Sequence, residues 1–257
     1  SLDMKRGTPS LKSILLLYNI IKSEKPDILQ TWLYHSDLLG LLLGKICHVK
    51  KIFWNIRCSN MDLHSYPLTT KLVLKLLVLL SKIPDGIIVN STSGRKLHQQ
   101  IGYKTKKWVE IYNGFEINKY VPFDIERKKQ KKALLTNNSE AIFIGTIARY
   151  DPMKGHSLLI EAVNHLVNVL NYKSPIFVLI GKGIDQQTKA IMDAIERYHL
   201  AGNFLLLGER KDIPDILPAL DIYVSPSLGE GFPNVVGEAM CCGVPCIVTD
   251  VGDSASV

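Results

Sequence analysis

The chain alternates between two hydrophobic patterns along almost its whole length. Apolar residues such as Leu159, Val163 and Leu170 recur at the spacing of one helix face. Residues 176–180, by contrast, are apolar throughout, as in a strand that is covered on both faces. Strands that alternate with helices favour right-handed crossovers and a parallel sheet. The pattern therefore predicts an α/β protein.

The same two patterns predict the individual elements. Strands are predicted over residues 27–31, 51–57, 86–90, 108–112, 141–147, 176–180, 203–207, 221–225 and 245–249. Helices are predicted over residues 11–25, 36–47, 68–82, 93–101, 159–170, 186–199 and 234–242, with a short helical turn near residue 213.

Residues 116–140 interrupt this alternation, because they are polar, rich in lysine and without a hydrophobic period. We interpret this segment as a linker between two doubly wound, Rossmann-like domains, residues 1–115 and 141–257. In open parallel sheets, ligands bind beyond the carboxyl ends of the strands. The loops that follow the predicted strands are therefore where we look for function.

Composition and charge narrow the class of protein. The 257 residues, of which 46% are hydrophobic, are enough to bury a large core. The net charge of +7 favours an anionic partner such as a nucleotide, a phosphorylated lipid, a membrane surface or a nucleic acid. The basic residues are scattered or lie in the predicted linker, without interleaved aromatic residues, which argues against nucleic acid.

The five cysteines are odd in number, and three of them crowd one apolar run without a histidine at zinc-ligand spacing. We interpret them as reduced thiols of a cytoplasmic protein. The sequence shows neither a secretion signal nor a stretch of about 18 apolar residues. Because it begins at Ser1 and ends at Val257 without a helix-stop pattern, we expect both domains to be incomplete.

The loop after the strand 141–147 is the first candidate for chemistry. It contains Arg149 and Lys154, and a helix follows it. A strand–loop–helix junction presents free backbone N–H groups and the positive end of a helix dipole. The two basic side chains are therefore candidates to clamp a diphosphate, with ordinary surface residues as the alternative interpretation.

A second candidate lies between Ser225 and Glu238. Its glycines let the backbone approach a ligand closely, and Pro233 suits the first turn of a helix. Glu230 and Glu238 are each able to hold a sugar diol, because carboxylates accept hydrogen bonds from vicinal hydroxyls. Alternatively, one carboxylate favours the helix N-terminus and the other is solvated.

The run from Glu230 to Met240, Glu-Gly-Phe-Pro-Asn-Val-Val-Gly-Glu-Ala-Met, resembles the signature of family-4 retaining glycosyltransferases. Further similar motifs follow in the order and approximate spacing of that family, at residues 113–116, 145–149, 154–155, 180–183 and 207–210. The resemblance implies the GT-B fold, in which two Rossmann-like domains face each other across a cleft. It also implies a reaction that retains anomeric configuration and needs no divalent metal, so we expect neither a metal nor another cofactor.

The resemblance also implies roles for individual residues. Arg149 and Lys154 would bind the donor pyrophosphate, Glu230 the donor hexose and Glu238 the ribose. By the habit of the family, the donor would be a UDP-sugar. The implied donor-binding residues are Gly183, Arg210, Gly231, Phe232, Pro233, Asn234 and Val235.

Two residues in the first half are candidates for the acceptor side. His35 and Arg57 follow two successive predicted strands, within the sequences Trp-Leu-Tyr-His and Ile-Arg-Cys-Ser-Asn. A similar pair occurs in relatives grouped with O-antigen, lipopolysaccharide and capsule synthesis, which implies a lipid-linked or envelope polysaccharide acceptor. A lone histidine is also common as a structural residue, and that interpretation stays open for His35.

The leucine-rich stretch 68–83 carries Lys71, Lys75 and Lys82 along one stripe. It is too short to span a bilayer, but it is suited to lie in the interface of an anionic membrane, which would make the protein peripheral on the inner face. The alternative is a core-packed helix whose lysines face water.

Two alternative functions also stay open: a GT-B nucleotide-sugar epimerase and a nucleotide-sugar-binding pseudoenzyme.

Overall fold

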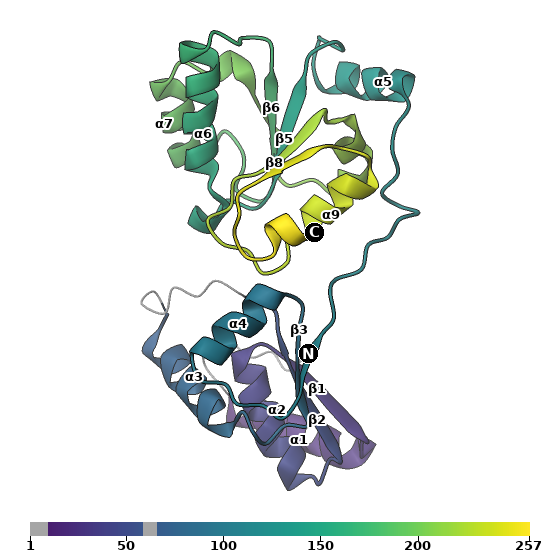
Figure 1. Cartoon of the computed structure of the whole chain (residues 1–257), viewed down its shortest axis with the longest axis vertical. Coiled ribbons are helices and arrows are strands. Elements are labelled where there is room, and N and C mark those ends of the chain that lie inside the picture. The colour runs from purple at the N-terminus through teal and green to yellow at the C-terminus, as the bar shows by residue number, and fades with distance from the viewer. Residues whose placement is uncertain (1–9, 59–65) are drawn as a thin grey trace. The chain divides into compact units, whose positions relative to one another are not determined.

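The computed structural model describes residues 10–58 and 66–257. The chain divides into two compact units, one that ends at Asn113 and one that begins at Gly114 (Figure 1). We call them the N-terminal unit and the C-terminal unit. Ser59 and Asn60, which belong to the acceptor-side sequence around Arg57, lie outside the described residues.

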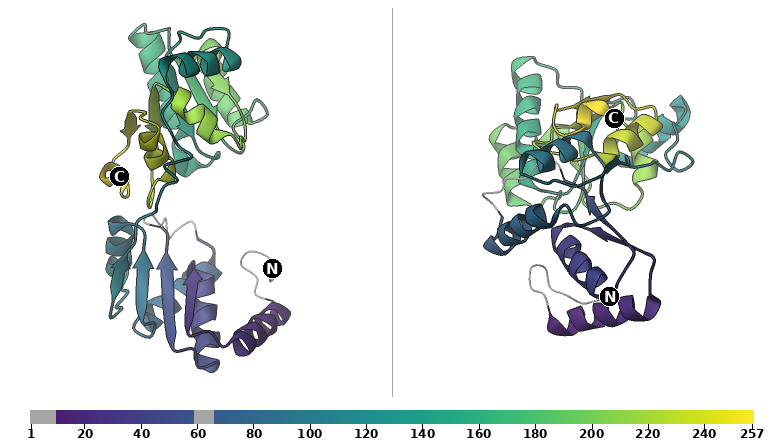
Figure 2. Two further views of the ribbon diagram at one scale, coloured as in Figure 1. Left: turned by 90° about the vertical axis from the view of Figure 1, so that its right-hand side faces the viewer. Right: turned by 60° about the horizontal axis from the view of Figure 1, so that its bottom comes forward.

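The N-terminal unit is built on a parallel sheet with the strand order β1-β2-β3-β4 (Figure 2, left). The strands are β1 (Ile28–Trp32), β2 (Lys51–Ile56), β3 (Gly86–Val89) and β4 (Trp108–Glu110). The helices are α1 (Leu11–Glu24), α2 (Tyr34–Ile46), α3 (Leu68–Leu80) and α4 (Thr92–Gln100).

The core of the N-terminal unit lies between the central strands and the helices. Trp54 on β2 pairs in register with Ile87 on β3, and both side chains are fully buried together with Leu77 of α3. Helix α2 packs close to β1 because Gly40 has no side chain, and a Cβ there would collide with Thr31. Ser91 begins α4 by accepting a hydrogen bond from the N–H of Gly94 at 3.1 Å.

The C-terminal unit contains a parallel sheet with the order β7-β6-β5-β8-β9. The strands are β5 (Phe143–Ile147), β6 (Ile176–Ile180), β7 (Phe204–Leu206), β8 (Ile222–Ser225) and β9 (Cys246–Val248). The α-helices are α5 (Ile125–Leu135), α6 (His156–Asn164), α7 (Lys189–Arg197), α8 (Ile213–Ile216) and α9 (Asn234–Cys241). A single π-helical turn, His165–Val169, extends α6, and short 3-10 turns span Pro152–Lys154, Ala201–Asn203, Leu217–Ala219 and Ser254–Ser256.

This sheet is doubly wound. One hydrophobic cluster joins it to α6 and α7, and a second cluster on its other side includes residues of α8 and α9 (Figure 1). The strand order reverses between β5 and β8, so the loops after these two strands leave the sheet side by side. Such a reversal is where open α/β sheets bind their ligands.

The predicted strands are all present, and the α/β class is confirmed. The segment 116–140 differs from the linker that we expected, because it contains α5. Lys132 of α5 is buried and donates to the carbonyl of Ala141 at 2.8 Å and to Asp221 at 2.5 Å. These partners belong to the C-terminal unit, so the lysines anchor α5 to it although the helix has little hydrophobic period.

None of the described helices is both long enough and apolar enough to cross a lipid bilayer.

Candidate active site

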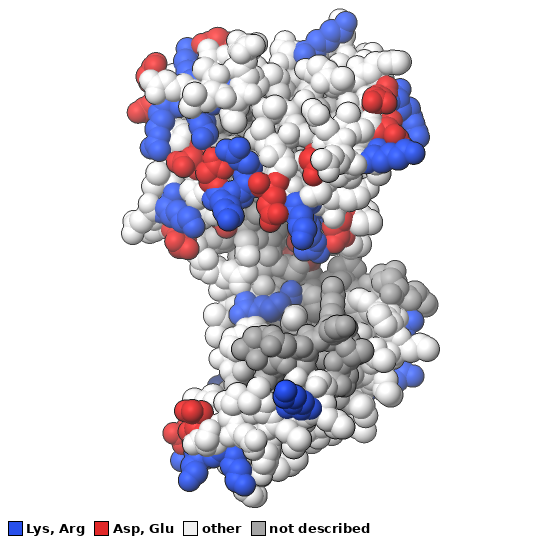
Figure 3. Space-filling model, turned by 180° about the vertical axis from the view of Figure 1, so that it is seen from behind, with Lys and Arg blue, Asp and Glu red and all other residues white. Residues whose placement is uncertain are grey.

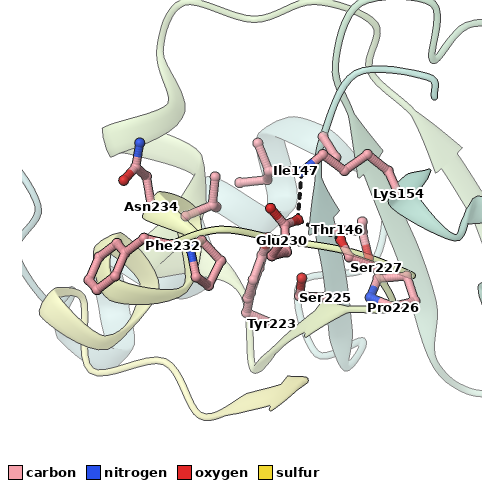
Figure 4. Close-up of a pocket in the computed structure, with 13 residues that line it drawn as sticks. Thr146, Ile147, Lys154, Tyr223, Ser225, Pro226, Ser227, Glu230, Phe232 and Asn234 are labelled. Atoms are coloured by element: carbon pink, nitrogen blue, oxygen red, sulfur yellow. Dashed lines mark hydrogen bonds and ion pairs between the residues drawn. The ribbon is translucent and has the colours of Figure 1, made fainter. Parts of the chain in front are cut away.

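A pocket lies at the carboxyl ends of β5 and β8, where the strand order reverses (Figure 4). It is entirely within the C-terminal unit. The residues that line it are Thr146, Ile147, Ala148, Lys154, Tyr223, Ser225, Pro226, Ser227, Glu230, Phe232, Pro233, Asn234 and Val235.

Lys154 and Glu230 meet in this pocket as an ion pair. The Lys154 Nζ lies 2.5 Å from Glu230 Oε1, and the Ser227 hydroxyl donates to the same oxygen at 2.7 Å (Figure 4). Both side chains are largely shielded from solvent, with 23% of Lys154 and 13% of Glu230 exposed. The pocket therefore holds a preformed pair of opposite charges beside a hydroxyl.

The local backbone explains how Lys154 reaches this position. Asp151 accepts a hydrogen bond from the N–H of Met153 at 3.0 Å and begins the short turn that ends at Lys154. Gly155 follows with a φ of 66°, and a Cβ at this position would collide with the carbonyl of Pro226. The loop after β5 is thus held against the loop after β8 by a contact that only glycine permits.

Helix α9 begins at the same pocket. Pro233 precedes its first residue, Asn234, and no side chain caps the helix. Asn234 and Val235 line the pocket, so the positive end of the helix dipole lies beside the Lys154–Glu230 pair. An ammonium group next to a helix N-terminus forms a setting in which a phosphate group is stabilised.

Glu238 lies one turn further along α9 and is not among the residues that line the pocket. Burial raises the pKa of Glu238, and a hydrogen bond from the hydroxyl of Tyr120 acts in the opposite direction. Burial beside this carboxylate raises the pKa of Tyr120 to about 12, so the tyrosine stays a donor. Tyr120 was not predicted from the sequence, because its partner is far away along the chain.

Comparison with known proteins identifies this unit. The family model described as Glycosyl transferases group 1 matches residues 139–257. Residues 139–257 are thus similar to the group 1 glycosyltransferases. The resemblance read from the motifs of this region is thereby confirmed.

Two relatives match nearly the whole chain at low identity. The chain is 27% identical over 247 residues to the UDP-Gal:alpha-D-GlcNAc-diphosphoundecaprenol alpha-1,3-galactosyltransferase of Escherichia coli, covering 94% of this chain and 62% of that protein. It is also 27% identical over 248 residues to the N,N'-diacetylbacillosaminyl-diphospho-undecaprenol alpha-1,3-N-acetylgalactosaminyltransferase of Campylobacter jejuni. This match covers 93% of this chain and 63% of that protein. The chain thus spans less than two thirds of the length of these relatives.

Solved structures share the architecture of both units. Anabaena HepE, solved in complex with UDP, superposes with a TM-score of 0.80 at 23% identity, covering 97% of this chain and 67% of that one. The sucrose-phosphate synthase of Thermosynechococcus elongatus superposes with a TM-score of 0.79 at 18% identity, covering 94% of this chain and 60% of that one. These matches confirm the predicted GT-B fold.

Within the C-terminal unit, Arg149 does not reach the pocket. Its side chain is 67% exposed and pairs with Asp151 at 2.8 Å. The N–H of Met153 and then the Arg149 guanidinium hold the pKa of Asp151 below its usual value. Arg149 and Lys154 therefore lie on one loop, but the structure brings only Lys154 together with Glu230.

The remaining predicted donor residues lie on neighbouring loops of the C-terminal unit. Phe232 lines the pocket and stacks on Phe115, with 6.1 Å between ring centroids, whereas Gly231 does not line it. Gly183 follows β6 with a φ of 74°. Arg210 follows β7 and pairs with Asp212 through two bonds of 2.8 and 2.6 Å. Neither Gly183 nor Arg210 lines the pocket.

The two acceptor-side residues lie in the N-terminal unit and are exposed. His35 is the second residue of α2, and Arg57 follows β2 and donates to the Asn113 side chain at 2.7 Å. Sequence reasoning missed a different histidine in this unit. His98 is buried, lies 2.8 Å from the Tyr34 hydroxyl, and burial lowers its pKa to about 4.

Two threonines that hold the loops of the pocket in place were not among the predicted site residues. Thr146 donates to the carbonyl of Val224 at 2.8 Å and joins β5 to β8. Thr249 donates to the carbonyl of Ser227 at 2.5 Å and supports the loop that carries Glu230. A polar residue near the end of an apolar strand, as at Thr146 and Thr249, is the signal in the sequence that points to them.

Proposed function

We propose that the protein is a retaining glycosyltransferase that transfers a hexose-type sugar from a nucleotide diphosphate donor, a UDP-sugar, to a lipid-linked or envelope polysaccharide acceptor. The observation that carries this proposal is the Lys154–Glu230 ion pair at the N-terminus of α9. A cation suited to phosphate and a carboxylate suited to sugar hydroxyls lie within one pocket, in a region similar to group 1 glycosyltransferases, and this supports the proposal.

The ion pair itself suggests how the donor is received. A diphosphate at the N-terminus of α9 competes with Glu230 for the Lys154 ammonium. The Glu230 carboxylate is then released from the lysine and accepts hydrogen bonds from the hydroxyls of the donor hexose. Lys154 remains beside the phosphate and stabilises the charge that develops on the departing nucleoside diphosphate.

The other predicted residues keep supporting roles in this proposal. Glu238, positioned by Tyr120, receives the ribose hydroxyls, and Arg149 turns from Asp151 toward the diphosphate. Arg210 lies beside the base. The backbone from Gly231 to Val235 surrounds the phosphates, and Gly183 leaves room for the nucleotide.

The acceptor assignment rests on the relatives. The printed names of the Escherichia coli and Campylobacter jejuni enzymes both describe acceptors on diphosphoundecaprenol. We infer a lipid-linked acceptor of this kind for the present chain, received on the side of His35 and Arg57. We further propose that the protein is cytoplasmic and acts at the inner face of the membrane.

Donor binding and transfer by two variants test this proposal. Lys154→Ala should weaken UDP binding at least about tenfold, because a charge on the diphosphate loses its partner. Glu230→Gln should bind UDP at least as tightly as the wild type, because the carboxylate that competes for Lys154 is removed, but it should lower sugar transfer by about a hundredfold, because the hexose contact is lost. Calorimetric titration with UDP and GDP, and transfer assays with UDP-hexoses, measure both effects.

Lys129→Ala is the matched control, since Lys129 forms an exposed pair with Glu140 at 2.9 Å away from the pocket. It should leave binding and transfer unchanged. If UDP binds Lys154→Ala as tightly as the wild type, the proposed donor site is wrong. Conversion of a UDP-sugar to its free epimer without acceptor would indicate an epimerase instead.

A further inference from the structure

Helix α3 has an apolar face that no described part of the N-terminal unit covers. Leu74 and Leu77 point inward, where the helix packs against α2. The opposite face carries apolar side chains at helical spacing, and Leu68 and Leu79 are 82% and 76% exposed. We call this face the outer stripe of α3, and it consists of Leu68, Leu72, Leu76, Leu79 and, just beyond the helix, Ile83.

The charged residues of the segment that carries the outer stripe are all basic. Lys71, Lys75 and Lys82 lie along the helix and just after it, and residues 66–84 contain no Asp or Glu. Lys75 and Lys82 are exposed, and neither forms an ion pair with a carboxylate of the described chain. The stripe is therefore a band of leucines beside two exposed lysines, Lys75 and Lys82, that form no ion pair with a described carboxylate.

Helix α5 shows that this pattern is not a general property of the lysine-rich helices. Lys128 and Lys132 of α5 both pair with Asp221, and Lys129 pairs with Glu140. The visible face of the C-terminal unit likewise mixes Lys and Arg with Asp and Glu (Figure 3). Exposed lysines without an ion pair, beside an apolar outer face, thus distinguish α3 from α5.

We propose that the outer stripe of α3 docks in the interface of a bilayer rich in anionic phospholipids. A helix of 13 residues is about 20 Å long, shorter than the hydrocarbon core of about 30 Å, so it lies along the surface. The leucines enter the boundary between headgroups and acyl chains, while the lysines contact phosphate groups. Pairing of two copies through this stripe would instead bring like charges together, so charge complementarity favours the anionic surface.

Sedimentation with lipid vesicles tests the proposal without a sugar donor or acceptor, so its result is independent of the proposed function. The protein should bind vesicles of phosphatidylglycerol and phosphatidylcholine, and bind phosphatidylcholine alone much more weakly. Replacing Leu72 and Leu79 together by Ser should lower partitioning at least about tenfold. Replacing Lys75 and Lys82 by Gln should lower it about fivefold for each lysine, and mainly at low salt.

Matched controls lie on α5. Ile125 and Leu134 are 77% and 81% exposed on a basic helix, so replacing both by Ser removes comparable apolar surface. Lys129→Gln with Lys131→Gln removes equal charge. These controls should bind vesicles as the wild type does, and unchanged thermal unfolding of every variant should show that each is folded.

Three results would overturn the proposal. Equal losses in the α3 and α5 variants would show unspecific adsorption, and binding independent of lipid charge would remove the role of the lysines. Self-association that depends on Leu72 and Leu79, without vesicle binding, would show that a second copy covers the stripe.

Discussion

At the scale of single residues, burial decides which ionisable groups change their chemistry. Asp37 in the N-terminal unit is 1% exposed, and its carboxylate accepts a hydrogen bond from Thr31 at 2.5 Å. Burial raises its pKa to about 7, whereas that hydrogen bond lowers it. The nearby Cys58 and Tyr103 have pKa values raised by burial as well, so both remain neutral near pH 7.

The raised pKa of Asp37 predicts a pH-dependent stability. Between its usual pKa of 3.8 and about 7, the folded chain binds more protons than the unfolded chain, so the free energy of unfolding falls as the pH rises. Asp37→Asn keeps the acceptor for Thr31 but cannot ionise. It should raise the free energy of unfolding at pH 8 by about 2–4 kcal/mol and flatten this pH dependence, as measured by urea unfolding at several pH values.

Asp85 is the control of opposite sign. Burial acts to raise its pKa, but hydrogen bonds from Lys51 and from the N–H of Ile52 outweigh it and hold the pKa below 3.8. Asp85→Asn should therefore lose stability above about pH 4. A stability of Asp37→Asn that stayed below the wild type at every pH would contradict the assignment.

At the scale of elements, α9 is held in place by the segment that follows the junction of the two units. The Phe115 ring packs directly over Gly237, where a Cβ would collide with it, and stacks on Phe232 of the pocket. Tyr120 bonds to Glu238 on the same helix. The segment and the helix therefore form one packed element, although more than a hundred residues separate them.

A double-mutant cycle tests this packing. Gly237→Ala should destabilise the protein by about 1–3 kcal/mol, because the new methyl group displaces the Phe115 ring. In the Phe115→Ala background, Gly237→Ala should change the free energy of unfolding only slightly. The difference between the two backgrounds gives a coupling energy of about 1 kcal/mol or more. Gly202→Ala is the control, since a Cβ there meets nothing within 4 Å. Additive effects of the two substitutions, measured by chemical unfolding, would exclude the packing.

At the scale of the whole molecule, the two units have separate hydrophobic cores. One cluster contains only residues before Gly114, and the other two contain only residues after it. Helix α5 belongs to the second unit, because the buried Lys132 bonds to Asp221 and to the carbonyl of Ala141.

Separate cores predict separate unfolding. Calorimetry should show two transitions, and Lys132→Ala should lower the midpoint of only one, since it leaves Asp221 partly unpaired. Lys132→Ala should lower the free energy of unfolding of this unit by about 1–3 kcal/mol. This is below the range for fully buried ion pairs, because Asp221 is 29% exposed and still pairs with Lys128. Asp37→Asn should shift the other transition. Equal shifts of both transitions by either variant would show that the units unfold as one.

Features that depend on local pattern could be predicted from the amino-acid sequence. Hydrophobic periodicity and apolar runs were enough to predict the strands and their parallel direction. Glycines beside charged residues, in the loops after the strands, pointed to Lys154 and Glu230. Tertiary structure alone decided the pairings between distant positions. Lys154 and Glu230 are 76 positions apart, and Lys132 and Asp221 are 89 apart, so neither contact has a local signature. Likewise, a run of leucines in α3 does not say which ones face outward, because packing against α2 chooses the buried side.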